Sequence, residues 1–248
     1  MKAFLRRLKE GTVGLNYGRD IIAQWIDEKL TQETHSDSID ILDLGCGHGD
    51  DLLNVRSTPG ERKIRLHGIE AYGPNQEEAR QKGIDVANID LERSVYPYAD
   101  NSIDVIIANQ IIEHTKEIFW IFSECSRILK LNGIMIVGIP NLASLHNRVL
   151  LLAGDQPSSI ELLGPHVRGI TLPGFRRFIE ADEIFKIESV KGSNFYPFPP
   201  FMSRSLSRIF PRLSVSIFIL IRKIHPSKKF KDVLSTRFYQ TNFYTGED

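Results

Sequence analysis

The segment of the chain best suited to bind a ligand is residues 41–50, which read ILDLGCGHGD. Glycine has no Cβ, so glycines let a turn tighten and let a ligand approach the backbone closely. An apolar run precedes the first of these glycines, Gly45, and ligands of open α/β sheets bind beyond the carboxyl ends of the strands. The pattern therefore predicts a strand, a binding loop and a helix in that order, with an adenosine-type ligand at the loop.

A dinucleotide site is the obvious competing interpretation. The dinucleotide fingerprint GxGxxG requires a glycine where this chain has Asp50. Asp43 stands before the first glycine, and Asp50 and Asp51 occupy the predicted helix start, where a pyrophosphate would otherwise bind at the positive end of the helix dipole. These carboxylates repel a phosphate and favour a ligand with a cationic end. S-adenosylmethionine, which carries an ammonium and a sulfonium, meets this requirement.

Further polar residues follow the next predicted strands. Glu70 closes the second apolar run, where an acidic residue usually holds the ribose hydroxyls of an adenosine cofactor. Asp90 closes the third run and is suited to accept from an adenine amino group, with Leu91 covering the ring. The fourth run is followed by residues 108–114, ANQIIEH. Because parallel strands end at one edge of a sheet, all these residues are expected to face one crevice.

The elements that position these residues alternate along the chain. Short continuous apolar runs predict the buried strands of a parallel sheet, at 41–44, 65–70, 84–89, 103–108 and 134–139. Two closing strands are predicted at 185–190 and 214–221. Helical periodicity predicts helices over 16–30, over 118–129 with Asn132-Gly133 as the stop, over 142–152, after a Thr171 cap, and near 203–210.

Composition narrows the functional classes. The 248 residues include 31 Lys and Arg against 31 Asp and Glu, so the surface as a whole is not built to follow a nucleic-acid backbone, and we expect no DNA partner. The two cysteines, Cys46 and Cys125, have no disulfide or zinc spacing, which favours a reducing, cytoplasmic setting and no bound metal. No apolar run approaches the roughly 20 residues of a membrane span, so we expect a soluble protein. The oligomeric state stays open.

Residues 38–140 resemble the core of the class I S-adenosylmethionine-dependent methyltransferases, in particular the small-molecule branch of type 11/12-like enzymes. The resemblance lies in DLGCGHG, in Glu70, in IDLE around Asp90 and in ANQIIEH. It implies that the glycine loop holds the methionine end of S-adenosylmethionine, Glu70 the ribose, and Asp90 with Leu91 the adenine. The full set of implied cofactor residues is Asp43, Gly45, Cys46, Gly47, Gly49, Glu70, Ala71, Asp90, Leu91, Asn109, Gln110 and His114.

The pattern of elements along the chain, together with this resemblance, predicts the fold and its division. We expect an α/β, Rossmann-like, doubly wound sheet of seven strands, mostly parallel with an antiparallel last strand, and a helical insertion between strands five and six. The expected parts are an N-terminal helical segment, the cofactor-binding core, a helical substrate-side insertion, the closing strands and a basic C-terminal tail. Their residues are 1–36, 37–140, 141–183, 184–224 and 225–248.

The acceptor of the methyl group is constrained mainly by what is missing. Superfamily members that methylate nucleobase amino groups carry an Asp/Asn-Pro-Pro-aromatic box after strand four, whereas residues 109–112 read NQII, so nucleobases are disfavoured. A hydroxyl acceptor benefits from a histidine base. Four histidines fall near the predicted crevice: His48, His114, His146 and His166. His166 is the first choice for the base and His114 the second.

The later part of the chain offers weaker pointers. Residues 140–148 and 166–171 resemble bacterial methyltransferases of glycan and surface-polymer assembly. From Phe201 onward nine Lys and Arg face three acids, beside the aromatic stretch 195–201, which is suited to a peripheral contact with an anionic membrane surface. The simpler interpretation is that these aromatics pack on the core. We therefore expect O-methylation of a small molecule or saccharide; the alternatives are a non-catalytic cofactor-binding partner protein and a protein or RNA methyltransferase.

Overall fold

The computed structural model describes residues 18–32, 38–56, 63–226, 229–236 and 241–246. The basic residues 1–11, the start of the first predicted helix at 16–17, and the tail residues Lys228 and Arg237 lie outside the described part. The α-helices are α2 Arg19–Gln32, α3 Asp50–Arg56, α4 Gly73–Gln81, α5 Ile118–Ile128, α6 Leu145–Leu152, α7 Leu172–Ile179 and α8 Pro200–Ile209. The strands are β1 Ser38–Leu44, β2 Lys63–Ile69, β3 Asp85–Ala87, β4 Ile103–Asn109, β5 Leu129–Pro140, β6 Phe185–Ser193 and β7 Ser216–Lys223, and the short 3-10 helices are η1 Ile112–His114, η2 Pro211–Leu213 and η3 Phe230–Thr236.

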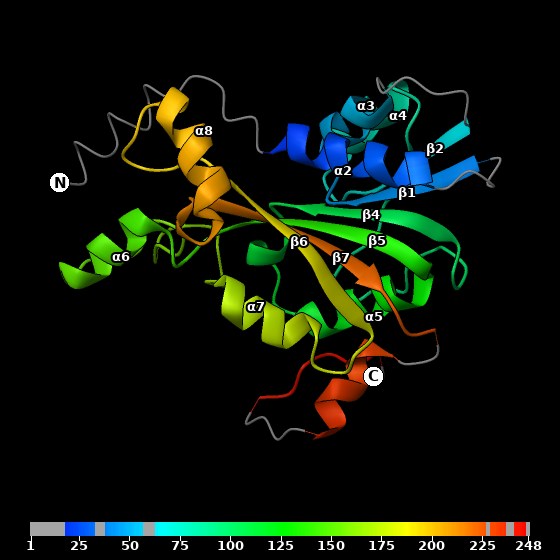
Figure 1. Cartoon of the computed structure of the whole chain (residues 1–248). Coiled ribbons are helices and arrows are strands. Elements are labelled where there is room, and N and C mark those ends of the chain that lie inside the picture. The colour runs from blue at the N-terminus through cyan, green and yellow to red at the C-terminus, as the bar shows by residue number, and fades with distance from the viewer. Residues whose placement is uncertain (1–17, 33–37, 57–62, 227–228, 237–240, 247–248) are drawn as a thin grey trace.

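The seven strands form one sheet in the order β3-β2-β1-β4-β5-β7-β6 (Figure 1). Strands β1 to β5 pair in parallel, and β7 runs antiparallel to both β5 and β6. The predicted Rossmann-like sheet, mostly parallel with an antiparallel last strand, is confirmed. Strand order reverses between β1 and β4, and ligands of such sheets bind outside the carboxyl ends of the strands at this point.

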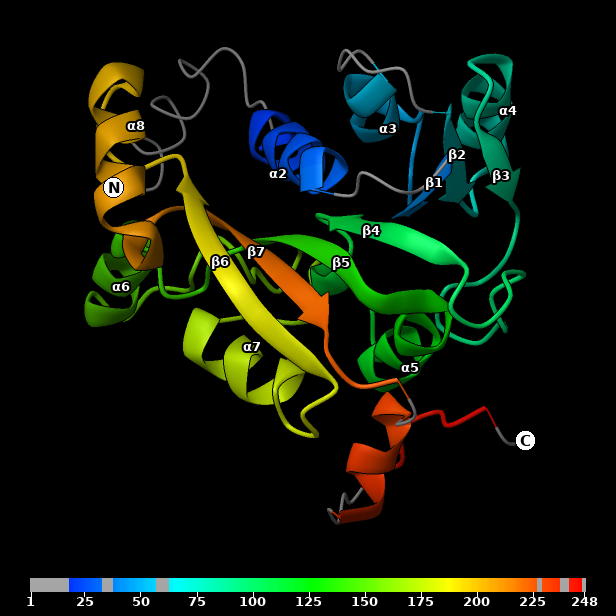
Figure 2. The same cartoon turned by 45° about the vertical axis from the view of Figure 1, so that its right-hand side comes forward.

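Helices cover both faces of the sheet, which explains why β1 and β4 are buried along nearly their whole length. Figure 2 shows α2, α3 and α4 on one face and α5 and α7 on the other. The first layer buries Trp25 of α2 and Leu52 of α3, while the second buries Phe122 of α5 and Phe175 of α7. Burial on both faces holds the strand ends, and the loops that follow them, in fixed positions.

The predicted stop of the helix over 118–129 is wrong. Helix α5 ends at Ile128, and Asn132 and Gly133 lie inside β5, which begins at Leu129. The register between β4 and β5 shifts after the Ile103–Leu129 pair, and Asn132 has φ 63° in this irregular segment. An Asn-Gly pair supports a left-handed backbone in a strand irregularity as well as it ends a helix, so the pattern was ambiguous.

Two helices, α6 and α7, lie between β5 and β6. The predicted Thr171 cap is confirmed, because its Oγ1 accepts a hydrogen bond of 3.2 Å from Gly174 N. Helix α8 begins at Pro200, about one turn before the predicted start, since proline suits the first position of a helix.

Among the described residues no helix is both long and apolar enough to cross a membrane.

The C-terminal residues are more than a basic tail. Residues 230–236 form η3, and its Phe230 is fully buried against Phe119 and Phe122 of α5. In the aromatic stretch 195–201, Phe195 is buried, whereas Phe201 is 75% exposed. The expectation that these aromatics pack on the core therefore holds for Phe195 and fails for Phe201.

Candidate active site

A cavity of about 230 Å³ opens at the edge of the sheet where β1 and β4 end. Its lining combines Asp43 of β1, the glycine loop, the last residue of β4 and the residue after it, the first turn of α3 and one residue of α2. These residues are Arg19, Asp43, Gly45, Cys46, Gly47, His48, Asp50, Asp51, Asn109 and Gln110. The structure thus brings together Asp43, Gly45, Cys46, Gly47, Asn109 and Gln110 from the set expected to bind the cofactor.

The glycine loop is fastened to the end of β2. The amides of Gly45 and Cys46 both donate to the carbonyl of Ile69, at 2.8 and 3.1 Å. Glu70 adds a second tie, because its carboxylate accepts from Gly47 N at 2.8 Å. Gly47 has φ 52°, and a Cβ built there meets no atom within 4 Å. The loop therefore presents bare backbone to the cavity, while Glu70 holds Gly47 in place and does not itself line the cavity.

The floor of the cavity is acidic. Asp43 is 4% exposed, and burial together with the charges of Asp51 and Glu70 raises the pKa of this carboxyl well above its ordinary value. The positive charge of Arg19 acts in the opposite direction. Among the described residues, the cavity lining holds the carboxyl groups of Asp43, Asp50 and Asp51 but only one guanidinium, that of Arg19. A ligand with a cationic group therefore relieves the repulsion among the acids. The ammonium and sulfonium of S-adenosylmethionine fit this acidic lining, whereas a pyrophosphate does not.

Arg19 is a site residue that sequence reasoning missed. Its Nε and Nη2 lie 3.0 Å from Asp51 Oδ1 and from Asp50 Oδ2 respectively. The guanidinium lines the cavity and has the geometry to hold a ligand carboxylate, such as the one at the methionine end of the cofactor. The sequence showed only an amphipathic helix here, and nothing in the periodicity placed its first turn over the glycine loop.

Gln110 carries two marks of a binding residue. Its backbone has φ 56°, which is uncommon for a residue with a side chain and concentrates at functional sites. Its side-chain nitrogen Nε2 is buried and has no hydrogen-bond partner within the described part of the chain. Next to it, Asn109 Nδ2 donates to Asp51 Oδ2 at 2.8 Å. An acceptor atom of a bound ligand would satisfy the Gln110 amide.

Several expected cofactor residues do not line this cavity. Ala71 and Asp90 are exposed, and Asp90 Oδ1 accepts from the backbone N–H of Glu92 at 2.8 Å. Leu91 packs partly against the core. Gly49 belongs to the loop, but a Cβ built on it points at Ile84 rather than into the cavity. The contacts of Asp90 and Leu91 with adenine stay predictions.

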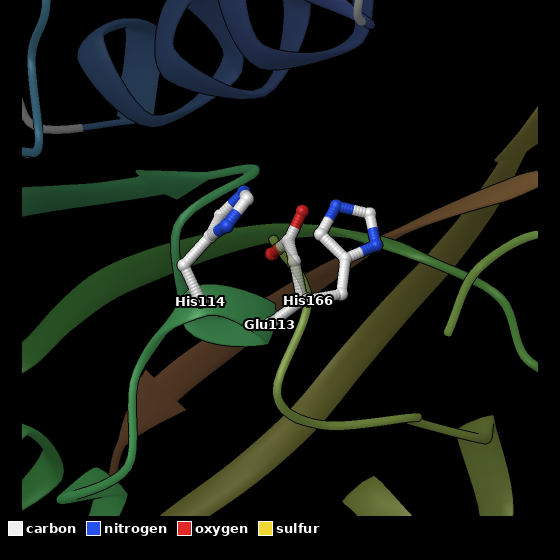
Figure 3. A group of neighbouring side chains, drawn as sticks. All are labelled: Glu113, His114 and His166. Carbon is white, nitrogen blue, oxygen red and sulfur yellow. The ribbon is translucent and has the colours of Figure 1, made fainter. Parts of the chain in front are cut away.

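The two histidines predicted as candidate bases lie beside each other. The rings of His114 and His166 lie 4.7 Å apart between centroids, and Figure 3 shows the carboxylate of Glu113 between them. The amide of Val167 donates to Glu113 O at 2.9 Å, which docks the 165–168 loop on η1. Glu113 was not among the expected site residues, because one acid beside a histidine reads in sequence as a helix-start residue.

The other two histidines have different surroundings. His48 lines the cavity and forms an ion pair of 2.9 Å with Glu78 when it is protonated. His146 contacts the hydroxyls of Ser144 and Ser158 at 3.1 and 2.8 Å. Neither lies beside His114 and His166. Of the four histidines near the crevice, His114 and His166 therefore stay the candidates for a base.

Comparison with known proteins assigns the chain to a family. Residues 26–184, more than half of the chain, match the family model described as methionine biosynthesis protein MetW. The chain belongs to the MetW family. Its fold is also that of solved methyltransferases: the CurJ carbon methyltransferase superposes with a TM-score of 0.59 at 15% identity, over 84% of this chain and 54% of the other. Membership of the class I S-adenosylmethionine-dependent methyltransferases is confirmed, with S-adenosylmethionine as the cofactor of that class.

Curated relatives match less than half of this chain. The bifunctional methionine biosynthesis protein MetXA/MetW of Rhodopirellula baltica is 29% identical over 48% of this chain and 19% of its own length. A probable S-adenosylmethionine-dependent methyltransferase of Mycolicibacterium smegmatis is 34% identical over 41% and 38%, and the malonyl-[acyl-carrier protein] O-methyltransferase of Legionella pneumophila is 27% identical over 39% and 34%. The chain therefore spans well under two thirds of the length of each of these relatives.

Proposed function

We propose that this MetW-family protein transfers a methyl group from S-adenosylmethionine to a hydroxyl of a small molecule or saccharide, glycan and surface-polymer precursors included. The observation that carries the proposal is the buried Asp43 carboxylate at the floor of a cavity that also holds Asp50 and Asp51. Such a site favours a positively charged ligand. S-adenosylmethionine supplies a methyl group that its sulfonium already activates.

The residues of the chain then have separate tasks at the donor end. Asp43 and the backbone of the glycine loop hold the ammonium, while Arg19 holds the carboxylate of the methionine moiety. Glu70, fixed by Gly47 N and Tyr72 N at 2.8 Å each, presents its carboxylate to the ribose. The amide of Gln110 donates to the ligand. Rigid placement of these groups is the main contribution that a protein makes to an in-line displacement.

At the acceptor end, His114 and His166 are the candidates for removing the hydroxyl proton, directly or through a bound ion. His114 lies in η1, just after the cavity residue Gln110, and the 165–168 loop brings His166 beside it. An O-methyltransferase among the relatives, from L. pneumophila, is consistent with a hydroxyl or carboxyl acceptor. Nucleobase amino groups stay disfavoured by the sequence of residues 109–112.

A second function is favoured by one observation. The R. baltica relative carries its matching part within a much longer bifunctional protein. A MetW-family chain that binds the cofactor and acts as the partner of another enzyme is therefore the competing proposal. Cofactor binding without methyl transfer to any acceptor would favour it.

Helix α8 supports the proposed contact with a membrane surface. Phe201, Ile209 and the neighbouring Phe210 are exposed, and Arg204 and Arg208 lie on the same helix. Apolar and basic side chains together suit an anionic interface. Flotation with anionic and with neutral vesicles tests this, since only the anionic vesicles should retain the protein.

Calorimetry tests the central proposal. The protein should bind S-adenosylmethionine and its demethylated product, whereas NAD should give no heat. Gly47→Arg and Glu70→Ala should each abolish cofactor binding, because the first fills the space beside the loop and the second removes the carboxylate that holds Gly47 in place. Transfer of a labelled methyl group to a panel of hydroxyl acceptors then separates the enzyme from the partner protein. Binding of NAD with exclusion of S-adenosylmethionine would refute the proposal.

A further inference from the structure

The carboxylate of Glu113 is buried without a hydrogen-bond partner among the described residues. The residue is 2% exposed, and neither of its carboxylate oxygens has a hydrogen-bond partner within the described part of the chain. A buried charged group without a partner costs several kcal/mol, so proteins normally pair it or use it to bind a ligand. The carboxylate is thus buried with no donor from the described part of the chain to satisfy it, in a place where a cation would be strongly attracted.

The two neighbouring histidines are oriented by backbone carbonyls. His114 Nδ1 lies 3.3 Å from the carbonyl oxygen of Pro165, and His166 Nδ1 lies 2.9 Å from that of Ser159. Because a carbonyl can only accept a hydrogen bond, each Nδ1 carries the hydrogen and each Nε2 keeps a lone pair. Histidines that ligate metals are held in this way by a carbonyl or carboxylate on the other ring nitrogen.

Distances bring the three side chains within reach of one ion. One ligand atom from each of Glu113, His114 and His166 lies within 4.8 Å of the others, and Figure 3 shows a ring nitrogen of His166 turned toward the Glu113 carboxylate. In a filled tetrahedral zinc sphere the ligand atoms are roughly 3.5 Å apart, as follows from bond lengths near 2.1 Å. Small rotations of the side chains close the difference.

We propose that Glu113, His114 and His166 bind one divalent transition-metal ion, zinc in the first place, with at least one coordination position left open. Two imidazoles and one carboxylate are a donor set that zinc, iron and manganese accept, and three protein ligands leave room for an exogenous oxygen. The cysteine spacing that argued against zinc does not bear on this site. Its third ligand comes from a loop more than fifty residues further along the chain, which sequence spacing does not connect to ANQIIEH.

The role of the ion rests on the proposed function. An acceptor hydroxyl bound in the open position would be more acidic than in water, because a bound cation stabilises the alkoxide. The histidines would then act as ligands, and no free imidazole would be required as the base. The 165–168 loop, docked on η1 by the hydrogen bond from Val167 N to Glu113 O, holds His166 beside His114 for this purpose.

Metal titration of the full chain tests the site without any methyl transfer. The protein is stripped with a chelator and titrated with Zn²⁺, Mn²⁺ and Mg²⁺ in a calorimeter. We expect one equivalent of Zn²⁺ per chain, and an affinity at least tenfold lower in Glu113→Gln and in His166→Ala, because even outer-shell changes cost about 10–100-fold. His146→Ala is the matched control and should keep the affinity, since His146 contacts Ser144 and Ser158 instead.

Two outcomes overturn the inference: the absence of stoichiometric metal binding to the unsubstituted protein, and equal affinities in all variants. The absorption spectrum of the Co²⁺ form provides a second measurement, which should show nitrogen and oxygen coordination. Calorimetry with S-adenosylmethionine on the same samples separates the two proposals. Cofactor binding without metal binding refutes this site alone, whereas metal binding without cofactor binding refutes the proposed methyl transfer and leaves the metal site standing.

Discussion

Arg19 and Asp51 bridge two helices above the cofactor cavity, with Arg19 Nε 3.0 Å from Asp51 Oδ1. The pair joins the first turn of α2 to the first turn of α3, and Arg19 O also accepts from Asn54 Nδ2 at 3.0 Å. Asp51 in turn accepts from Asn109 Nδ2 at the end of β4. One chain of polar contacts therefore runs from α2 across the cavity to the strand that leads to the acceptor side.

Arg19→Met should weaken the binding of S-adenosylmethionine by about ten- to a hundredfold. Hydrogen bonds to a charged group are worth about 1.5–3 kcal/mol, and the ligand carboxylate would lose its guanidinium. Arg222→Met is the control, since that arginine pairs with Glu188 on the last two strands, away from the cavity. Calorimetry measures both affinities. Equal affinities would show that Arg19 only joins the helices.

Asp43→Asn should lower cofactor affinity by at least tenfold while stabilising the free protein at neutral and higher pH. The pKa of Asp43 is raised from an ordinary value of 3.8, so above about pH 4 the folded state binds more protons than the unfolded state and stability falls as pH rises. Asparagine has no proton to release in this pH range, so its contribution to stability does not depend on pH. The difference in unfolding free energy should therefore grow, in favour of the variant, from pH 5 to pH 8.

Urea denaturation without cofactor at these two pH values measures that difference. Asp232→Asn is a suitable control because Asp232 is exposed on η3, far from the loop in the chain. A gap that is constant with pH would mean that the Asp43 carboxylate is not the destabilising group.

Alanine at Gly49 should mainly lower stability, whereas alanine at Gly47 should mainly lower cofactor affinity. A Cβ at Gly49 meets Ile84 Cδ1 at 2.1 Å and the backbone has φ 83°, so Gly49→Ala should lower the unfolding free energy by roughly 1–3 kcal/mol. A Cβ at Gly47 meets nothing within 4 Å, so Gly47→Ala should lose only the smaller stability that a side chain at φ 52° costs and should mainly weaken cofactor binding. Thermal unfolding and calorimetry on both variants check this pattern, and a larger stability loss at Gly47 would contradict it.

Cys46 should react slowly although it lines the cavity. Burial and the nearby charges of Asp43 and Glu70 raise the pKa of its thiol to about 12, so almost no thiolate is present at pH 8. Alkylation with iodoacetamide should modify neither cysteine of the native protein within minutes, and both after denaturation. Rapid labelling of Cys46 in the native protein would show that the loop opens.

The donor half of the site was largely predictable from sequence. Residues 41–50 combine an apolar strand, alternating glycines and early helix carboxylates, and each is a local pattern that implies its structure without its partners. The same holds for the Thr171 cap, whose hydrogen bond spans three residues. Local patterns failed at Asn132 and Gly133, where one dipeptide suits either a helix end or a bulged strand and only the pairing with β4 decides.

The acceptor half depended on contacts between distant segments. His114 and His166 were expected separately, as two rival bases, and their proximity appeared only once the 165–168 loop was seen docked on η1. Glu113 had no sequence signal, because what marks it is the lack of any partner in a buried place. Arg19 likewise became a site residue only when α2 packed over the glycine loop.

The amino-acid sequence by itself determined the alternation of strands and helices and the glycine loop with its carboxylates, and hence the prediction that this loop binds a cationic cofactor rather than a phosphate. These follow from spacing, backbone freedom and charge over a few neighbouring residues. The tertiary structure alone decided which charges share the cavity, which histidines meet and which carboxylate is left unpaired. Those properties depend on burial and on distances between residues far apart in the chain, and neither is defined until the sheet and its two helical layers have formed.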